Sequence, residues 1–278
     1  MKTEEDPIYF DSHMHTPLCK HAIGEPSEYA EAGKKAGLKG IIITCHSPMP
    51  GNFSSDVRMT QAEFPHYVEM VEKTSQKYQG DFEVLLGIES DWFPGMEDWL
   101  SQLHKKANFH YVIGSVHPFT QEYKTKFNRG DSLKFQQGYF THLADAAESQ
   151  LFDCISHPDV IKNMFSNEWE FSKLNDTVRT CLERIKRSGT AMELNTSGLN
   201  KKYSEMNPGE EMLSMMSELN IPIVMSSDSH TPNRVGADFD KGLRLLKKVG
   251  YQTISYFKER KRHDLNTIDV ANSLGFSL

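Results

Sequence analysis

A chain of 278 residues with 38% hydrophobic and 25% charged residues is long enough to bury one sizeable core. It has no apolar run approaching the roughly 20 residues needed to span a bilayer, and its net charge of -7 argues against broad binding to nucleic-acid backbones. The N-terminal stretch lacks an apolar signal segment, and the four cysteines show no CxxC or disulfide-like spacing. We therefore expect a single cytoplasmic domain over residues 1–278 with reduced thiols.

The first half of the chain alternates between predicted strands and predicted helices. Apolar runs at 7–10, 40–44, 82–88 and 111–116 are typical of buried strands. The stretches 27–37, 60–78 and 97–106 are predicted as helices, and the polar stretch 124–131 is predicted as a loop.

The second half repeats this pattern, with helices predicted at 133–149, 172–188, 208–219 and 239–249 and strands at 152–156, 190–194 and 222–226. The basic tail KERKRH is interpreted as a solvated helix end. About seven strand-then-helix units without hairpin turns predict a parallel α/β fold. A TIM-like (β/α)7 barrel fits best, and an open doubly wound sheet is the alternative.

Side chains of metal-ligand type follow the predicted strands. The residues at or just past a carboxyl strand end are His13, His15, His46, Glu89, His117, His157, Asp228 and His230. In a barrel these ends converge on one face, so we expect one metal centre there. With His21 from the first loop, the set exceeds what one tetrahedral zinc takes, which indicates two or three ions of Zn, Fe or Mn. Glu89 is placed to bridge two of them, and Asp11 is expected to orient an imidazole from behind.

Seven motifs carry a resemblance to a known family. They are DSHMHTPLCKHAIG at 11–24, TCHSP at 44–48, GIESDW at 87–92, GSVH at 114–117, ISHPD at 155–159, ELNTSGL at 193–199 and SSDSH at 226–230. Through them the chain resembles the PHP (polymerase and histidinol phosphatase) superfamily, and more closely its histidinol-phosphate phosphatase branch. The resemblance implies a distorted seven-stranded barrel with three metal ions.

The resemblance also implies how the ligands are shared. One ion would be held by His13, His15, Glu89 and Asp228, a second by Glu89, His117 and His157, and the third by His21, His46 and His230. The chain departs from the usual pattern at Cys45, where relatives have an acid, and at Asn200 and Lys201, where an Arg is common.

The predicted reaction is hydrolysis of a phosphomonoester by metal-activated hydroxide, with Glu89, Asp228 and His230 at the catalytic centre. The resemblance implies L-histidinol phosphate as the substrate and histidine biosynthesis as the setting. Phosphate recognition needs cations near the barrel mouth. Arg234 is the first candidate and Lys201 another, while Asn195 and Ser197 either contact the substrate or cap the following turn.

Other activities stay open at this stage. A PHP phosphoesterase acting on another phosphomonoester or a nucleotide would use the same centre. An amidohydrolase-type C–N hydrolase also opens with HxH, but it would need a bridging Lys and a final Asp without the His two residues later. A nucleic-acid phosphodiesterase is disfavoured by the acidic charge. We expect no nucleic-acid or membrane partner, and we make no prediction of oligomeric state.

Overall fold

The structure is a computed structural model that describes residues 7–278. Residues 1–6, which belong to the stretch without a predicted signal segment, lie outside the described residues. The strands are β1 (Phe10–Asp11), β2 (Gly40–Ile43), β3 (Glu83–Asp91), β4 (Tyr111–Ser115), β5 (Cys154–Ile155), β6 (Ala191–Asn195), β7 (Ile223–Ser226), β8 (Thr253–Lys258) and β9 (Lys261–Asn266). The helices are α1 (Pro26–Lys35), α2 (Phe64–Lys77), α3 (Glu97–Leu103), α4 (Gln121–Phe127), α5 (Ser132–Glu148), α6 (Asn175–Ser188), α7 (Glu210–Glu218), α8 (Phe239–Lys248) and α9 (Thr267–Ser273).

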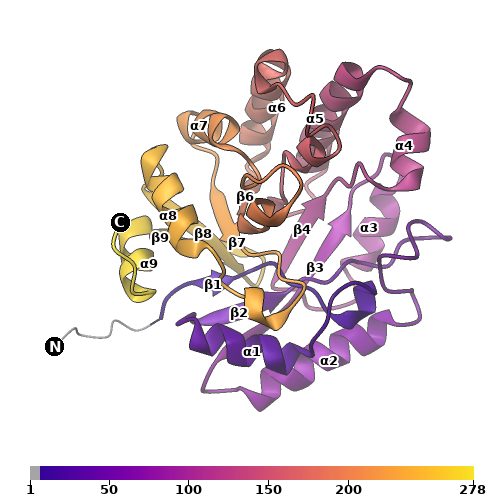
Figure 1. The fold of residues 1–278 in the computed structure, drawn as a ribbon. Coiled ribbons are helices and arrows are strands. Elements are labelled where there is room, and N and C mark those ends of the chain that lie inside the picture. Colours follow the sequence, from indigo (N-terminus) through magenta and orange to yellow (C-terminus); the bar gives the residue numbers. More distant parts are fainter. Residues whose placement is uncertain (1–6) are drawn as a thin grey trace.

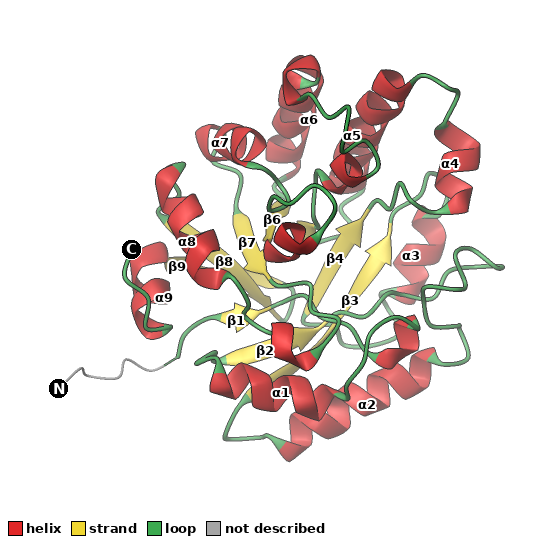
Figure 2. Cartoon of the chain, in the orientation of Figure 1, coloured by secondary structure: helices red, strands yellow, loops and turns green. Residues whose placement is uncertain are grey.

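The strands pair in sequence order from β1 to β9, and every pair up to β7–β8 is parallel. Helices surround the strands on the outside (Figures 1 and 2). A parallel bridge between Met14, just past β1, and Ser229, just past β7, joins the first strand of the parallel array to the seventh, beyond which β8 pairs with β7. This closure confirms the predicted TIM-like barrel and excludes the open doubly wound sheet.

A buried tyrosine strengthens the seam between β1 and β7. The Tyr9 hydroxyl donates to the Met225 carbonyl at 2.9 Å and accepts from the Met225 amide at 2.9 Å. Its side chain therefore satisfies backbone groups that a neighbouring strand would otherwise pair with. The barrel is distorted at this seam because a side chain replaces part of the backbone ladder.

Alternate residues of each strand point into the barrel. On β3, Leu85 lies in an apolar cluster inside the barrel, and Glu89 lies further along the same face at the carboxyl end. All strands from β1 to β8 contribute to this inner cluster, which consists of Phe10, Ile42, Leu85, Tyr111, Ile113, Cys154, Ala191, Val224 and Phe257. The interior is therefore apolar toward the amino ends of the strands and polar toward their carboxyl ends.

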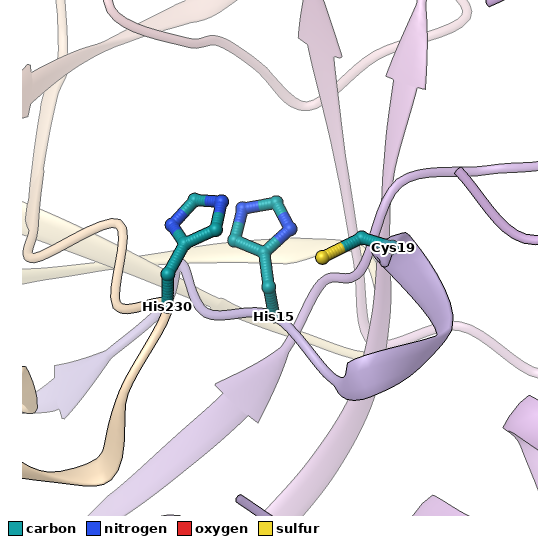
Figure 3. Close-up of side chains that lie close together, drawn as sticks. All are labelled: His15, Cys19 and His230. Atoms are coloured by element: carbon teal, nitrogen blue, oxygen red, sulfur yellow. The ribbon is translucent and has the colours of Figure 1, made fainter. Parts of the chain in front are cut away.

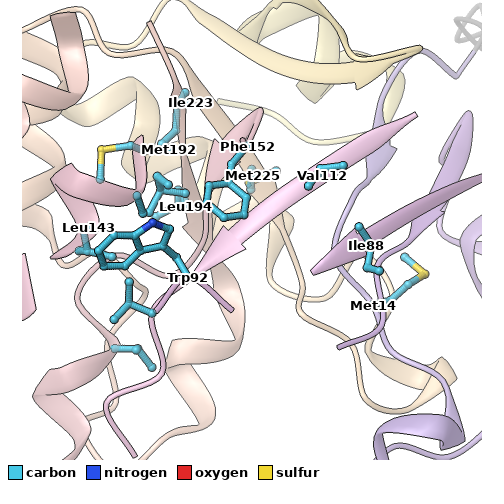
Figure 4. Close-up of a cluster of buried hydrophobic side chains, with 14 of the residues drawn as sticks. Met14, Ile88, Trp92, Val112, Leu143, Phe152, Met192, Leu194, Ile223 and Met225 are labelled. Atoms are coloured by element: carbon cyan, nitrogen blue, oxygen red, sulfur yellow. The ribbon is translucent and has the colours of Figure 1, made fainter. Parts of the chain in front are cut away.

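A second, larger core fills the space between the barrel wall and the helices, and Figure 4 shows part of it. Met192 and Leu194 of β6 point outward into this layer, whereas Ala191 of the same strand faces the barrel interior. Burial on both faces explains why the strands are continuous apolar runs in the sequence. No helix among residues 7–278 is long and apolar enough to cross a membrane.

The predicted loop at 124–131 is wrong in its first half, because residues Gln121–Phe127 form α4. The Thr120 side chain accepts a hydrogen bond from the Tyr123 amide and caps the helix. Tyr123 is buried and Phe127, one turn later, packs against the core. The polar lysines between them conceal this apolar side in the sequence.

The basic tail is also wrong as a helix end, because it forms the antiparallel hairpin β8–β9. Glu259 and Arg260 at its tip have φ of 53° and 60°, typical of a tight hairpin turn. The tip contacts the amino ends of neighbouring barrel strands, where Lys258 pairs with Glu83 and Arg260 pairs with Asp153. The hairpin therefore crosses the barrel at the end opposite the predicted metal ligands.

Candidate metal centre

The predicted ligands surround a cavity of about 230 Å³ at the carboxyl ends of the strands. Its lining residues are His21, His46, Val57, Arg58, Glu89, His117, Phe119, Thr120, His157, Val160, Lys201, Asp228 and His230. His13 and His15 lie directly beneath this surface and are fully buried. The structure thus brings together all the residues predicted as metal ligands, including His21 from its loop.

Glu89 lies at the centre of this group, with its two carboxylate oxygens facing different imidazoles. Oε1 lies 3.2 Å from His157 Nε2 and 3.6 Å from His117 Nε2. Oε2 lies 3.5 Å from His13 Nε2 and 3.6 Å from His15 Nε2. A carboxylate in this position has the geometry to bridge two cations.

Asp228 is another carboxylate of the centre, and its side chain is 8% exposed. Its Oδ1 lies 3.2 Å from His15 Nε2 and 3.7 Å from His13 Nε2. Its Oδ2 accepts hydrogen bonds from Ser197 Oγ at 3.0 Å and from Asn195 Nδ2 at 3.3 Å. One oxygen is therefore held by neutral donors while the other faces the imidazoles.

The backbone at Asp228 is strained, with φ of 47°, a left-handed conformation that non-glycine residues rarely adopt. This conformation follows β7 directly and directs the carboxylate back over the barrel mouth. Backbone strain of this kind concentrates at functional sites, where the surrounding structure enforces it.

A third set of ligands lies nearer the solvent. His21 Nε2 and His230 Nε2 are 3.0 Å apart. Their other ring nitrogens lie near backbone oxygens, with His21 Nδ1 at 2.7 Å from the Cys19 carbonyl and His230 Nδ1 at 3.1 Å from the Asp228 carbonyl. These contacts leave both Nε2 atoms directed toward one point, which His46 also approaches.

Groups of potential ligand atoms lie within 4.8 Å of one another in several combinations. Two of them, His13 with His15 and Asp228, and His21 with His46 and His230, match the sharing that the resemblance implies. Other combinations do not match this sharing. One of them consists of His15, Cys19 and His230, in which the Cys19 thiol points toward the His15 ring and His230 lies on the far side of that ring (Figure 3).

The residues fit divalent metal ions. His13 Nε2 and Glu89 Oε2 are buried and 3.5 Å apart, and neither makes a hydrogen bond among residues 7–278, although His46 Nδ1 lies 2.7 Å from Glu89 Oε2 without hydrogen-bond geometry. Buried polar atoms are nearly always paired, so two such atoms facing each other indicate a ligand between them. Imidazole nitrogens and carboxylate oxygens suit Zn, Fe or Mn.

Burial favours the neutral, metal-binding form of the His46 and His230 imidazoles, whereas neighbouring carboxylates outweigh burial and raise the pKa of His13, His15 and His117. Burial lowers the pKa of His46 to about 4 and that of His230 to about 3. Burial alone raises the pKa of the Glu89 carboxyl, but the imidazoles of His46 and His13 hold that pKa well below its usual value. Neutral imidazoles and an ionised carboxylate are the protonation states that bind a cation.

The imidazole of His13 is oriented by Glu193, not by Asp11 as predicted. Glu193 Oε1 lies 2.7 Å from His13 Nδ1. Asp11 instead accepts from the amides of Ser227 at 3.0 Å and Gly236 at 2.9 Å. The chain leaves the sheet after β1, so the period-two argument that placed Asp11 behind His13 does not hold there.

A second carboxylate, Asp91, orients His117 and was missed by sequence reasoning. Its Oδ2 lies 3.1 Å from His117 Nδ1. Asp91 follows Glu89 by two residues on β3, and Glu193 precedes Asn195 by two on β6. Alternation along a strand could have identified both carboxylates, because each faces the barrel interior.

The residues predicted to contact the substrate do not all lie at the cavity. Arg234 pairs with Asp238 at 2.9 Å in a short 3₁₀ turn, so its guanidinium is engaged there and not at the cavity. Asn195 and Ser197 are engaged with Asp228, and Asn195 also caps the turn after β6. Among the described residues, the cations that line the cavity are Lys201, as predicted, and Arg58, which the sequence did not single out.

Comparison with known proteins agrees with this geometry. The PHP domain family model matches residues 11–197. A protein of Deinococcus radiodurans named "Probable histidinol-phosphatase" is 34% identical over 260 residues, covering 90% of this chain and 97% of that protein. The histidinol-phosphatase of Bacillus subtilis is 26% identical, over 83% of this chain and 96% of that protein.

A solved structure has the same fold. It is the crystal structure of histidinol phosphate phosphatase from Lactococcus lactis, complexed with Zn, L-histidinol and phosphate. It superposes with a TM-score of 0.77 over 92% of this chain and 98% of that chain, at 18% identity. The family model and the relatives together show that this chain belongs to the PHP domain family, in its histidinol-phosphatase branch.

Proposed function

We propose that this chain is a metal-dependent phosphomonoester hydrolase that acts on L-histidinol phosphate through a centre of three divalent ions. The observation that carries the proposal is the position of Glu89, whose two oxygens face separate sets of imidazoles at the mouth of the barrel. Relatives named histidinol-phosphatase, including the one at 34% identity, support the reaction. Zn, L-histidinol and phosphate in the Lactococcus lactis protein support the metal and the substrate class.

The proposed ligands are those predicted from the sequence: His13, His15, His21, His46, Glu89, His117, His157, Asp228 and His230. Bound ions would lower the pKa of a water molecule and stabilise the negative charge on the phosphoryl oxygens. Zn is the first candidate, and the donor set also accommodates Fe or Mn. We further propose that one barrel, residues 1–278, carries the whole activity.

Other residues of this chain position the Asp228 carboxylate or bind the phosphate. Asn195 and Ser197 hold one oxygen of Asp228, so that its other oxygen stays directed at the His13 and His15 imidazoles. Lys201 lines the cavity and offers an ammonium group to the phosphate. Glu89 is fully buried, which excludes water around its ionised carboxylate and strengthens its attraction for cations, while the Asp228 carboxylate borders the cavity.

The cavity also has apolar lining residues, which suit the organic part of the substrate. They are Val57, Phe119 and Val160. Apolar side chains in the same cavity as a cationic centre match a molecule with a phosphate at one end and an aromatic ring at the other.

The test is a substrate comparison with protein of known metal content. We expect kcat/KM for L-histidinol phosphate to exceed that for other phosphomonoesters, and a phosphodiester to react far more slowly. Asp228→Asn should remove turnover while leaving the fold intact. Preference for the diester, or full turnover after stripping of the metal, would contradict the proposal.

A further inference from the structure

Arg58 is a buried arginine beside the metal centre, in the segment between β2 and α2. Its exposed fraction is 2%. Nη2 lies 2.7 Å from Asp91 Oδ2 and Nη1 lies 3.2 Å from Asp91 Oδ1, a fork-to-fork pair. Nη1 also donates to the Ser47 carbonyl at 3.0 Å. Burying a guanidinium is costly unless it is paired, so the pair with Asp91 holds this side chain in one position.

Asp91 connects Arg58 to His117, which is a proposed metal ligand. The oxygen that receives Arg58 Nη2 also lies 3.1 Å from His117 Nδ1. When His117 Nδ1 carries the proton, Nε2 has the free lone pair that can bind a metal ion. His117 Nε2 lies 3.6 Å from Glu89 Oε1. Arg58, Asp91 and His117 therefore form a continuous chain of contacts from the loop to the centre.

The other oriented imidazole, His13, is supported differently. Glu193 accepts from His13, from the His157 amide at 2.6 Å and from Asn195 Nδ2 at 3.0 Å. These additional donors come from barrel strands or their ends, and none is a formal cation. Among residues 7–278, Arg58 of an irregular segment is the one side chain besides His117 that pairs with the Asp91 carboxylate, which makes the orientation of His117 depend on Arg58.

We propose that Arg58 is a positioning residue of the metal centre: its bidentate pair with Asp91 locks the tautomer and the orientation of His117. The inference rests on the proposed function, because it treats His117 as a metal ligand. Outer partners of ligating histidines typically contribute about 10- to 100-fold to metal affinity. Loss of the Arg58 fork is expected to fall in that range for the ion that His117 binds.

The segment has a second anchor, which supplies a matched control. The Glu122 carboxylate of α4 accepts from the Ser54 amide at 2.9 Å and from the Ser54 hydroxyl at 2.9 Å. Glu122→Ala releases the segment at Ser54 without touching Asp91. If Arg58 acted only by tethering the segment, Glu122→Ala would reproduce the effect of removing Arg58.

The experiment measures zinc affinity by chelator competition and the visible spectrum of the cobalt-substituted protein, for Arg58→Met, Arg58→Lys, Asp91→Asn and Glu122→Ala. We expect Arg58→Met to weaken one zinc ion about 10- to 100-fold and to change the cobalt spectrum. Arg58→Lys, which keeps the charge but not the fork, should recover part of the affinity. Glu122→Ala should match the wild type, and Arg58→Met combined with Asp91→Asn should bind zinc like Asp91→Asn alone.

Several outcomes would overturn the inference. Unchanged or tighter zinc binding in Arg58→Met would do so, as would an equal loss in Glu122→Ala. A raised KM with wild-type zinc affinity would assign Arg58 to substrate binding instead. If Arg58→Met does not fold, Arg58→Lys decides, because wild-type affinity and spectrum in that variant contradict a role for the fork. Failure of the wild type to bind zinc or hydrolyse phosphomonoesters would refute the proposed function itself, which these variants do not address.

Discussion

Glu193 Oε1 lies 2.7 Å from His13 Nδ1, and this contact directs the opposite nitrogen of the imidazole toward Glu89 Oε2, 3.5 Å away. Glu193 lies on β6 and His13 follows β1, so the contact spans the barrel interior. The contact fixes the proton on His13 Nδ1. A neutral amide in place of the Glu193 carboxylate would accept this hydrogen bond less strongly.

We therefore predict that Glu193→Gln lowers zinc affinity about 10- to 100-fold while the protein stays folded. Metal content after dialysis against a chelator series measures the effect. Glu170→Gln is the control, because Glu170 is exposed and pairs with Lys173 on the surface. Equal metal retention in both variants would contradict the role of Glu193.

Lys201 and Arg234 are the two cations predicted from the sequence to bind the substrate phosphate, and the structure favours Lys201. Lys201 lines the cavity, whereas Arg234 is engaged with Asp238. We expect Lys201→Met to raise KM for the phosphomonoester about tenfold, because a charge-assisted hydrogen bond is lost, and Lys201→Arg to restore most of it. Arg234→Met should leave KM unchanged, and steady-state kinetics on the three variants checks this. A raised KM in Arg234→Met alone would reverse the assignment.

Removal of the metal should destabilise the protein. The centre packs ionised carboxylates and imidazoles in a buried space, and a ligand that binds the native state alone adds stability according to its concentration and affinity. At a free ion concentration 1,000 times the dissociation constant the gain is about 4 kcal/mol. Thermal unfolding with and without chelator is expected to show a Tm lower by several degrees in the chelator. Zinc should restore the original Tm, and Asp228→Asn should show a smaller difference. Identical Tm values in the wild type would contradict metal binding.

His104 gives a pH dependence that is separate from the metal centre. Burial lowers its pKa to about 3, and the Ser90 hydroxyl lies 3.0 Å from its Nε2. An unfolded histidine has a pKa of about 6.5. Between these values the unfolded chain binds more protons, so this group lowers the free energy of unfolding as pH falls from 6.5 toward 3.

We predict that His104→Gln reduces the loss of stability between pH 7 and pH 4.5 by about 1 to 2 kcal/mol. Urea unfolding of metal-free wild type and variant at both pH values measures this difference. Working without metal keeps the titration of the proposed ligands common to both proteins. An equal loss in the two proteins would contradict a partly buried, neutral His104.

The sequence determined the chemistry of the site through local pattern. Strands buried on both faces appear as apolar runs, and the residue after each run lies at the carboxyl end of a strand. Glu89 and Asp228 were identifiable in this way, because a parallel barrel gathers such ends on one face whatever the helices outside contain. The family motifs around them carried the same information.

Tertiary structure alone decided which groups support these ligands. Glu193 and Asp11 are both carboxylates near the predicted ligands, and only the closed barrel places Glu193 against His13 and Asp11 against the Ser227 amide. Arg58 carries no local signal, since it lies in an irregular segment and acquires its role by meeting Asp91. Strand periodicity fixes the direction of a side chain relative to its own strand, but contacts between distant segments depend on the closure of the whole barrel.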